Sequence, residues 1–157
     1  MSDYRTFVVP YDFSVHAQAA LRAATDLATR LSADLHLIHV IQPPSYAYGY
    51  GMGGAAVSPS FDLNELRERA LKSLREVVDG VVDFPGRIEP HVVDGSSIAI
   101  AINEAADKLG ADLIVMGTHG RTGLAHVFIG SVAERTLRRA PCPVMTIQSA
   151  EKEPETD

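Results

Sequence analysis

The sequence predicts an α/β fold in which helices cover both faces of a parallel β-sheet. Five short apolar runs without a helical period indicate strands, at residues 5–11, 34–41, 87–93, 111–116 and 143–147. Between them lie segments whose apolar residues recur every three or four positions, the pattern of an amphipathic helix. Strands that alternate with helices in this way form parallel sheets with right-handed crossovers.

The helix boundaries follow from capping residues at the start of each apolar stripe. The expected helices run from Ser14 to Leu31, from Asp62 to about Val77, from the stretch "DGSS" to about Leu109, and from Ser131 to about Arg139. Asp62 and Glu65 have the spacing of a capping box. Pro90 places the third strand toward an edge of the sheet, because proline cannot donate to a central ladder.

The chain of 157 residues predicts one α/β domain, which we place at residues 1–148. Residues 42–60 are rich in Pro, Gly, Ser and Tyr, so we expect a long mobile loop there. Residues 149–157 form a charged tail that we expect to fray.

Composition excludes several classes of partner. The net charge of −6 offers no basic surface for nucleic acid. No apolar stretch approaches the length of a membrane span, and the amino-terminal stretch shows no secretory pattern, so we expect a cytoplasmic protein that binds no membrane. The one cysteine, Cys142, lies between two prolines and is expected to fill space rather than to react.

The stretch "MGTHGRTGLAHVFIGSVAE" begins at Met116, follows the fourth strand and contains four glycines. Glycine allows positive φ and lets a ligand come close to backbone amides, and a helix that starts at Ser131 adds N–H groups and a positive dipole end. We therefore expect an anion site here. The alternative is purely structural, because Ser131 and Glu134 also fit a capping box that needs no ligand.

Two strand exits are candidates for the ligand site. "PYDFS" follows the first strand and "GTHGRTG" follows the fourth. Ligands of open α/β sheets bind where the strand order reverses, so we expect these exits to lie side by side. GxxxxGK[ST] is absent, and the first strand is followed by "PYDFS" and not by GxGxxG, which disfavours a P-loop enzyme and a dinucleotide-binding fold.

The spacing of Gly117, Gly120, Gly130 and Ser131 resembles the nucleotide-binding motif of the universal stress protein family. "VVPYDFS", "LHLIHVI" and "PCPVMTI" resemble that family's first, second and last strands, so the likeness extends over nearly the whole chain. The resemblance implies a doubly wound sheet of five strands in the order 3-2-1-4-5. It also implies ATP binding, as in the family's nucleotide-binding branch, and a homodimer through the last strand, near Val144 and Ile147.

Carried over by position, the resemblance implies a role for each matching residue. The first strand's exit, with Pro10 and Asp12, would lie on the ribose side, and the backbone of Val40 would meet adenine. The remaining contacts would come from Met116 and Gly117 to adenine and ribose, and from Gly120, Gly130, Ser131 and Val132 to the phosphates. Arg121 is the one cation within the loop and could pair with phosphate, although an exposed arginine is the commoner case.

These observations predict a regulatory protein whose adenine nucleotide, ATP or else ADP or AMP, changes the surface shown to a protein partner. Magnesium is expected through the phosphates. The alternative is a slow ATP hydrolase or nucleotidyl-transfer enzyme, for which His119, His126 and Asp12 are the candidate groups. We assign no catalytic residue. We also expect no protein metal site, because His36 and His39 face opposite sides of their strand.

Overall fold

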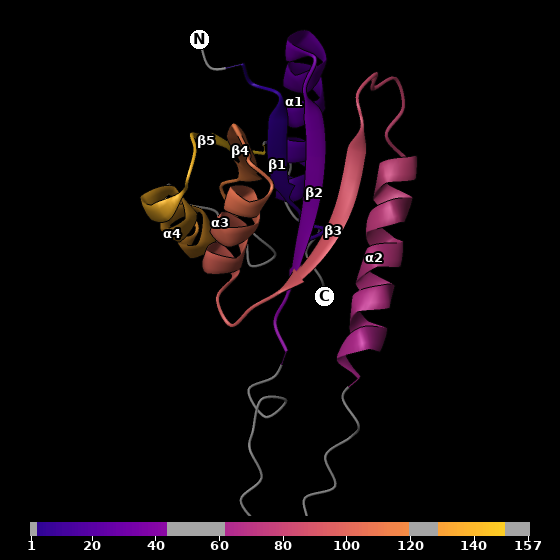
Figure 1. The fold of residues 1–157 in the computed structure, drawn as a ribbon, viewed down its shortest axis with the longest axis vertical. Helices are drawn as coiled ribbons and strands as arrows, with labels where there is room; N and C mark the ends of the chain where they lie inside the picture. The colour runs from indigo at the N-terminus through magenta and orange to yellow at the C-terminus, as the bar shows by residue number, and fades with distance from the viewer. Residues whose placement is uncertain (1–2, 44–61, 120–128, 150–157) are drawn as a thin grey trace, which may run out of the picture.

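A computed structural model describes residues 3–43, 62–119 and 129–149 of the chain. Strands and helices alternate strictly along these residues (Figure 1). The strands are β1 (Thr6–Pro10), β2 (Asp34–Ile41), β3 (Ile88–Asp94), β4 (Leu113–Gly117) and β5 (Val144–Ile147). The helices are α1 (Val15–Leu31), α2 (Leu63–Asp79), α3 (Ile98–Lys108) and α4 (Ser131–Arg139).

The strands form one parallel sheet in the order β3-β2-β1-β4-β5, which confirms the predicted fold class and strand order. Proline at position 90 correctly indicated an edge, since β3 is the outermost strand on its side. Strand β5 forms the opposite edge. In Figure 1, α3 and α4 lie on one side of the sheet, with α1 behind β1 and β2 and α2 along β3.

Two apolar clusters hold the layers together, one on each face of the sheet. The first joins Phe7, Leu35 and Leu37 to α1 and to Leu74 of α2. The second joins the opposite face of β1, β2 and β4 to α3 and α4, with Ile102 as its largest fully buried helical side chain. Successive residues of the central strands therefore pack in different clusters, as expected of a sheet covered on both sides.

The predicted helix starts are largely confirmed. Ser14 is the N-cap of α1, and its Oγ accepts a hydrogen bond of 3.1 Å from the N–H of Ala17. Asp62 is the N-cap of α2, and its carboxylate accepts hydrogen bonds from the N–H groups of Asn64 and Glu65. The side chain of Glu65 pairs with Arg69.

Cys142 packs against the α3 and α4 cluster, as its position between prolines predicted. Burial, together with the charge of Asp112, raises the pKa of the Cys142 thiol, which disfavours the reactive thiolate. Among the described residues, no helix has the length and apolar character needed to cross a membrane. The predicted loop at 42–60 and the tail fall almost entirely outside the described residues.

Candidate functional site

The exits of β1 and β4 lie next to each other, as predicted. Strand β1 pairs with β2 on one side and with β4 on the other, so the direction of winding reverses at β1. The segments that follow β1 and β4 therefore leave the same edge of the sheet side by side. This is the place where open α/β sheets bind their ligands.

The exit of β1 is a tight turn built around Asp12. Its Oδ1 accepts hydrogen bonds from the backbone N–H of Ser14 at 3.0 Å and from the Ser14 hydroxyl at 2.5 Å. Between them Phe13 has a φ of 66°, a left-handed conformation that is uncommon for a bulky residue. Asp12 thus has a structural function at the start of α1, and the same bonds fix its carboxylate at the candidate site.

Aromatic rings line the turn after β1. The ring of Phe13 lies 5.3 Å from that of Tyr11 and 5.0 Å from that of His39, between ring centres. His39 Nδ1 lies 2.7 Å from the carbonyl oxygen of Tyr11, so this nitrogen carries a proton and donates. Burial, then the charge of Asp12, raises the pKa of the Tyr11 hydroxyl, while Arg22 opposes the shift. Sequence reasoning missed this cluster, since it joins the turn after β1 to His39 of β2, far away in the sequence.

Val40 lies beyond the end of the ladder between β1 and β2. The last register pair of that ladder is Pro10 with Ile38, whereas β2 continues to Ile41. The backbone of Val40 pairs with Val93 on the β3 side, and its side chain packs on the α3 and α4 cluster. Its main-chain groups on the β1 side thus lie past the ladder, at the carboxyl edge of the sheet.

Gly117 ends β4 against the first turn of α1. A Cβ at this position would lie 2.9 Å from the Cβ and 3.0 Å from the backbone carbon and oxygen of His16. Gly110 is the positive-φ glycine of the described residues, so an unusual φ is not what position 117 requires. It requires the absence of a side chain. Met116, just before it, is buried in the α3 and α4 cluster.

His16 is a candidate that the sequence did not suggest. Its ring is buried at the start of α1, and no group of the described residues forms a hydrogen bond with its Nδ1. The ring of His119 lies 5.5 Å away between centres, and His119 Nδ1 is 2.9 Å from the hydroxyl of Thr118. A buried ring nitrogen without a partner is costly and marks a place where a ligand or water could bind.

Gly130 closes the loop that contains the other glycines. Its N–H donates a 2.7 Å hydrogen bond to the carbonyl of Thr118, and a Cβ would lie 2.9 Å from that same oxygen. The bond brings the start of α4 to the exit of β4. Gly120 and Arg121, two of the predicted phosphate contacts, lie outside the described residues.

The alternative interpretation of Ser131 and Glu134, a capping box at the start of α4, is not what the structure shows. The N-cap is Gly130, which makes no side-chain capping bond, and Ser131 is the first helical residue. The carboxylate of Glu134 pairs instead with Arg138 one turn later, at 2.8 Å. A glycine cap leaves the first N–H groups of α4 without a capping side chain, and the side chain of Ser131 is exposed beside them.

Fold and site together define a doubly wound α/β protein with its candidate ligand edge at the switch point between β1 and β4. The model of the universal stress protein family matches residues 3–148, and this chain belongs to that family. It is 33% identical over 150 residues to the universal stress protein MJ0531 of Methanocaldococcus jannaschii. This alignment covers 96% of this chain and 85% of the relative.

Solved structures agree with this assignment. The structure of MJ0577, from the same organism, superposes with a TM-score of 0.77 at 25% identity, over 96% of this chain and 100% of that one. A universal stress protein solved in complex with cAMP superposes with a TM-score of 0.63 at 25% identity, over 95% of this chain and 100% of that one.

Proposed function

We propose that this protein binds an adenine nucleotide at the switch point between β1 and β4, as ATP with Mg²⁺ or as a smaller adenine nucleotide. The nucleotide would change the surface that the protein presents to a partner. The complex of a related universal stress protein with cAMP supports the ligand class. The proposed contacts are those of the family motif: Pro10, Asp12, Val40, Met116, Gly117, Gly120, Arg121, Gly130, Ser131 and Val132.

The observation that carries the proposal is the uncapped start of α4. Gly130 supplies no capping side chain, so the N–H groups of the first turn could donate to an anion. The hydrogen bond from Gly130 to Thr118 holds this helix end at the exit of β4. Phosphate oxygens would accept from these N–H groups and from the exposed Ser131 hydroxyl, and the helix dipole would favour their charge.

The adenosine would lie on the β1 side of the phosphates. The carboxylate of Asp12 is fixed by Ser14 and could accept from ribose hydroxyls. The backbone of Val40, beyond the β1 ladder, could bond the edge of adenine. His16, buried with an unpartnered Nδ1 beside Gly117, offers a further polar group to the ligand or to a bound water.

The test is calorimetric titration of ATP into nucleotide-free protein and into a Ser131→Ala variant. Ser131 is not the N-cap, so its loss leaves stability nearly unchanged, within about 0.5 kcal/mol. Loss of a hydrogen bond to a charged phosphate costs about 1.5 to 3 kcal/mol, which is a decrease in affinity of about tenfold to somewhat over a hundredfold.

The matched control is Ser97→Ala. Ser97 is the N-cap of α3, also makes no side-chain capping bond, and follows β3 rather than β4. ATP affinity should be the same as in the wild type. If the wild type fails to bind ATP at millimolar concentration, or if Ser131→Ala binds as tightly as the wild type, the proposed phosphate site is wrong.

We also propose a homodimer through β5, the edge strand that follows β4. Val144 and Ile147 pack partly against the protein's own two clusters, and Met145 between them is 37% exposed. An exposed apolar side chain on an open strand edge favours pairing with a second copy. Light scattering should give a dimer for the wild type and a monomer for Met145→Lys; a monomeric wild type would rule out this assembly.

A further inference from the structure

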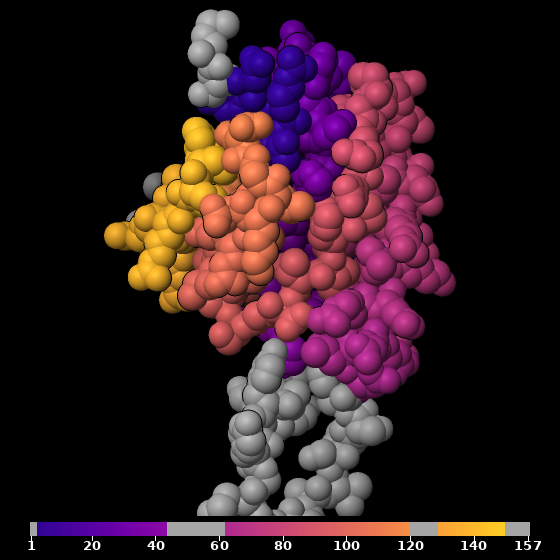
Figure 2. Space-filling view, viewed as in Figure 1, coloured from indigo at the N-terminus to yellow at the C-terminus, as the bar shows by residue number. Residues whose placement is uncertain are grey.

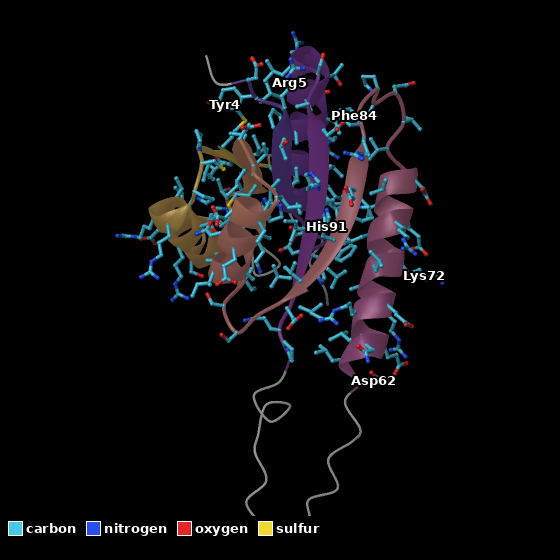
Figure 3. All side chains as sticks on the ribbon, viewed as in Figure 1. Tyr4, Arg5, Asp62, Lys72, Phe84 and His91 are labelled. Atoms are coloured by element: carbon cyan, nitrogen blue, oxygen red, sulfur yellow. The ribbon has the colours of Figure 1, made fainter. Side chains whose placement is uncertain are left out.

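Three potential metal ligands from two adjacent strands meet on the sheet face that carries α3. In the ladder between β2 and β3, His36 pairs with Glu89 and Ile38 pairs with His91. Because side chains alternate along a strand, Glu89 and His91 point to the same face as His36. Figure 3 shows His91 over the strip where β2 and β3 run side by side. None of these residues belongs to the proposed nucleotide site.

The ligand atoms lie close enough to share one ion. His36 Nδ1 is 2.9 Å from His91 Nε2 and 3.9 Å from Glu89 Oε2, and one such atom from each residue lies within 4.8 Å of the other two. Two ligands at about 2.05 Å from a tetrahedral zinc ion are about 3.3 Å apart. The observed separations lie on either side of this value, so small side-chain rotations would suffice.

We propose that His36, Glu89 and His91 form a binding site for a divalent transition metal ion, with Zn²⁺ as the best fit. Two imidazoles and one carboxylate are a donor set typical of zinc with an open fourth position. Imidazole also suits copper, nickel and iron(II), whereas Mg²⁺ and Ca²⁺ prefer oxygen ligands alone. The proposal does not depend on nucleotide binding.

The two histidines are suited to give up the proton that now lies between them. Their facing nitrogens are within hydrogen-bond distance, so one ring donates and the other accepts. A metal ion between the rings needs a lone pair from each of the two facing nitrogens. The ring that now donates can provide one when its proton moves to its other nitrogen, with no net change in charge.

Solvent can reach the site from the side of α3. His91 also lines a cavity of about 210 Å³ between β3 and α3, with Glu104 and Lys108 on its helical wall. Figure 2 shows that the atoms of β3 lie beside those of α3 and are not covered by them on this face. Glu89 is 49% exposed at its side chain, so an ion and a water ligand could enter without unfolding of the sheet.

The experiment is titration of zinc chloride into chelator-treated, nucleotide-free protein, followed by calorimetry. We expect one zinc ion per chain. Even outer-sphere partners of a metal contribute about tenfold to a hundredfold in affinity, so the ligand variants Glu89→Gln and His91→Ala should each weaken zinc binding by at least tenfold. Substitution by Co²⁺ should give the visible absorption of a four-coordinate ion, and this absorption should be lost in both variants.

The matched control is His39→Gln, which removes a half-buried histidine from the opposite face of the same strand. It should bind zinc as the wild type does. Circular dichroism would show whether each variant is folded. Glu89→Gln alters an exposed side chain and is expected to fold, so it tests the proposal even if His91→Ala does not fold. Absence of zinc binding at millimolar concentration, or wild-type affinity in Glu89→Gln, would overturn the proposal.

Discussion

Substitution of Gly117 by alanine should destabilise the protein without any ligand. The new Cβ would lie 2.9 Å from the Cβ of His16, closer than real Cβ contacts come, and 3.0 Å from its backbone carbon and oxygen. His16 is in the first turn of α1, so either the helix or the end of β4 must shift. Overpacking of this kind costs about 1 to 3 kcal/mol.

The matched control is Gly80→Ala, which should have the opposite sign. Gly80 has a φ of −78°, and its Cβ would meet only carbonyl oxygens at 3.4 and 3.5 Å, an ordinary contact. Alanine in a compatible backbone conformation stabilises by about 0.4 to 1 kcal/mol, because the unfolded chain loses freedom. Both variants keep the net charge and differ from the wild type by one methyl group.

Thermal unfolding of nucleotide-free protein would separate the two. One kcal/mol shifts the melting temperature of a chain of this size by about 2 to 4 °C, so Gly117→Ala should melt about 2 to 12 °C lower and Gly80→Ala slightly higher. A folded Gly117→Ala that melts at the wild-type temperature would refute the packing argument. The glycine would then be needed for ligand approach alone.

Three further predictions concern the same edge and the sheet beside it. Ser14→Ala removes the one side-chain cap of α1 and should lower the free energy of unfolding by about 0.5 to 2 kcal/mol in urea titration; an unchanged midpoint would contradict the observed cap. Burial lowers the pKa of His36, so the unfolded chain binds that proton more readily, and stability should fall as pH drops through about 6.5 and level off below the folded pKa. Replacement by His36→Gln should flatten this response, and an equal slope would refute it. ATP turnover, measured by phosphate release, should lie well below the roughly 1 to 100 per second of kinases, because the described residues place no lysine or arginine at the start of α4. Turnover within that range would favour the enzyme alternative.

The sequence predicted the fold well because each element carries its own local signal. Apolar runs, stripes and capping residues gave every strand and helix, with boundary errors of one or two positions. The start of β4 shows why boundaries were less certain. The carboxylate of Asp112 accepts hydrogen bonds of 2.9 Å from the backbone N–H groups of Arg5 and Thr6. Strand β4 begins only at the next residue, Leu113. That contact joins residues over a hundred positions apart and has no local pattern.

Only one part of the candidate site could be predicted from the sequence, namely that the segments after β1 and β4 lie next to each other. Glycine spacing located the loop and the start of α4, but not which residue caps that helix. It also could not show that Gly117 faces His16, since helix packing depends on the register of distant strands. The same limit applies to His36. Strand parity correctly separated it from His39, whereas its actual neighbour, His91, is 55 residues away and is found only from the β2 and β3 register.

Under the proposed function, the glycines of the motif would satisfy two demands at once. Gly117 and Gly130 both lie where a Cβ would meet protein backbone, and in the proposed site both would also let a ligand approach the amides at the sheet edge. A glycine variant that loses nucleotide binding would not show which demand had failed. The Ser131 hydroxyl escapes this ambiguity, because it caps no helix and is exposed at the first position of α4. Its removal can weaken binding only by the loss of a contact to the ligand, which makes it the decisive position at this edge.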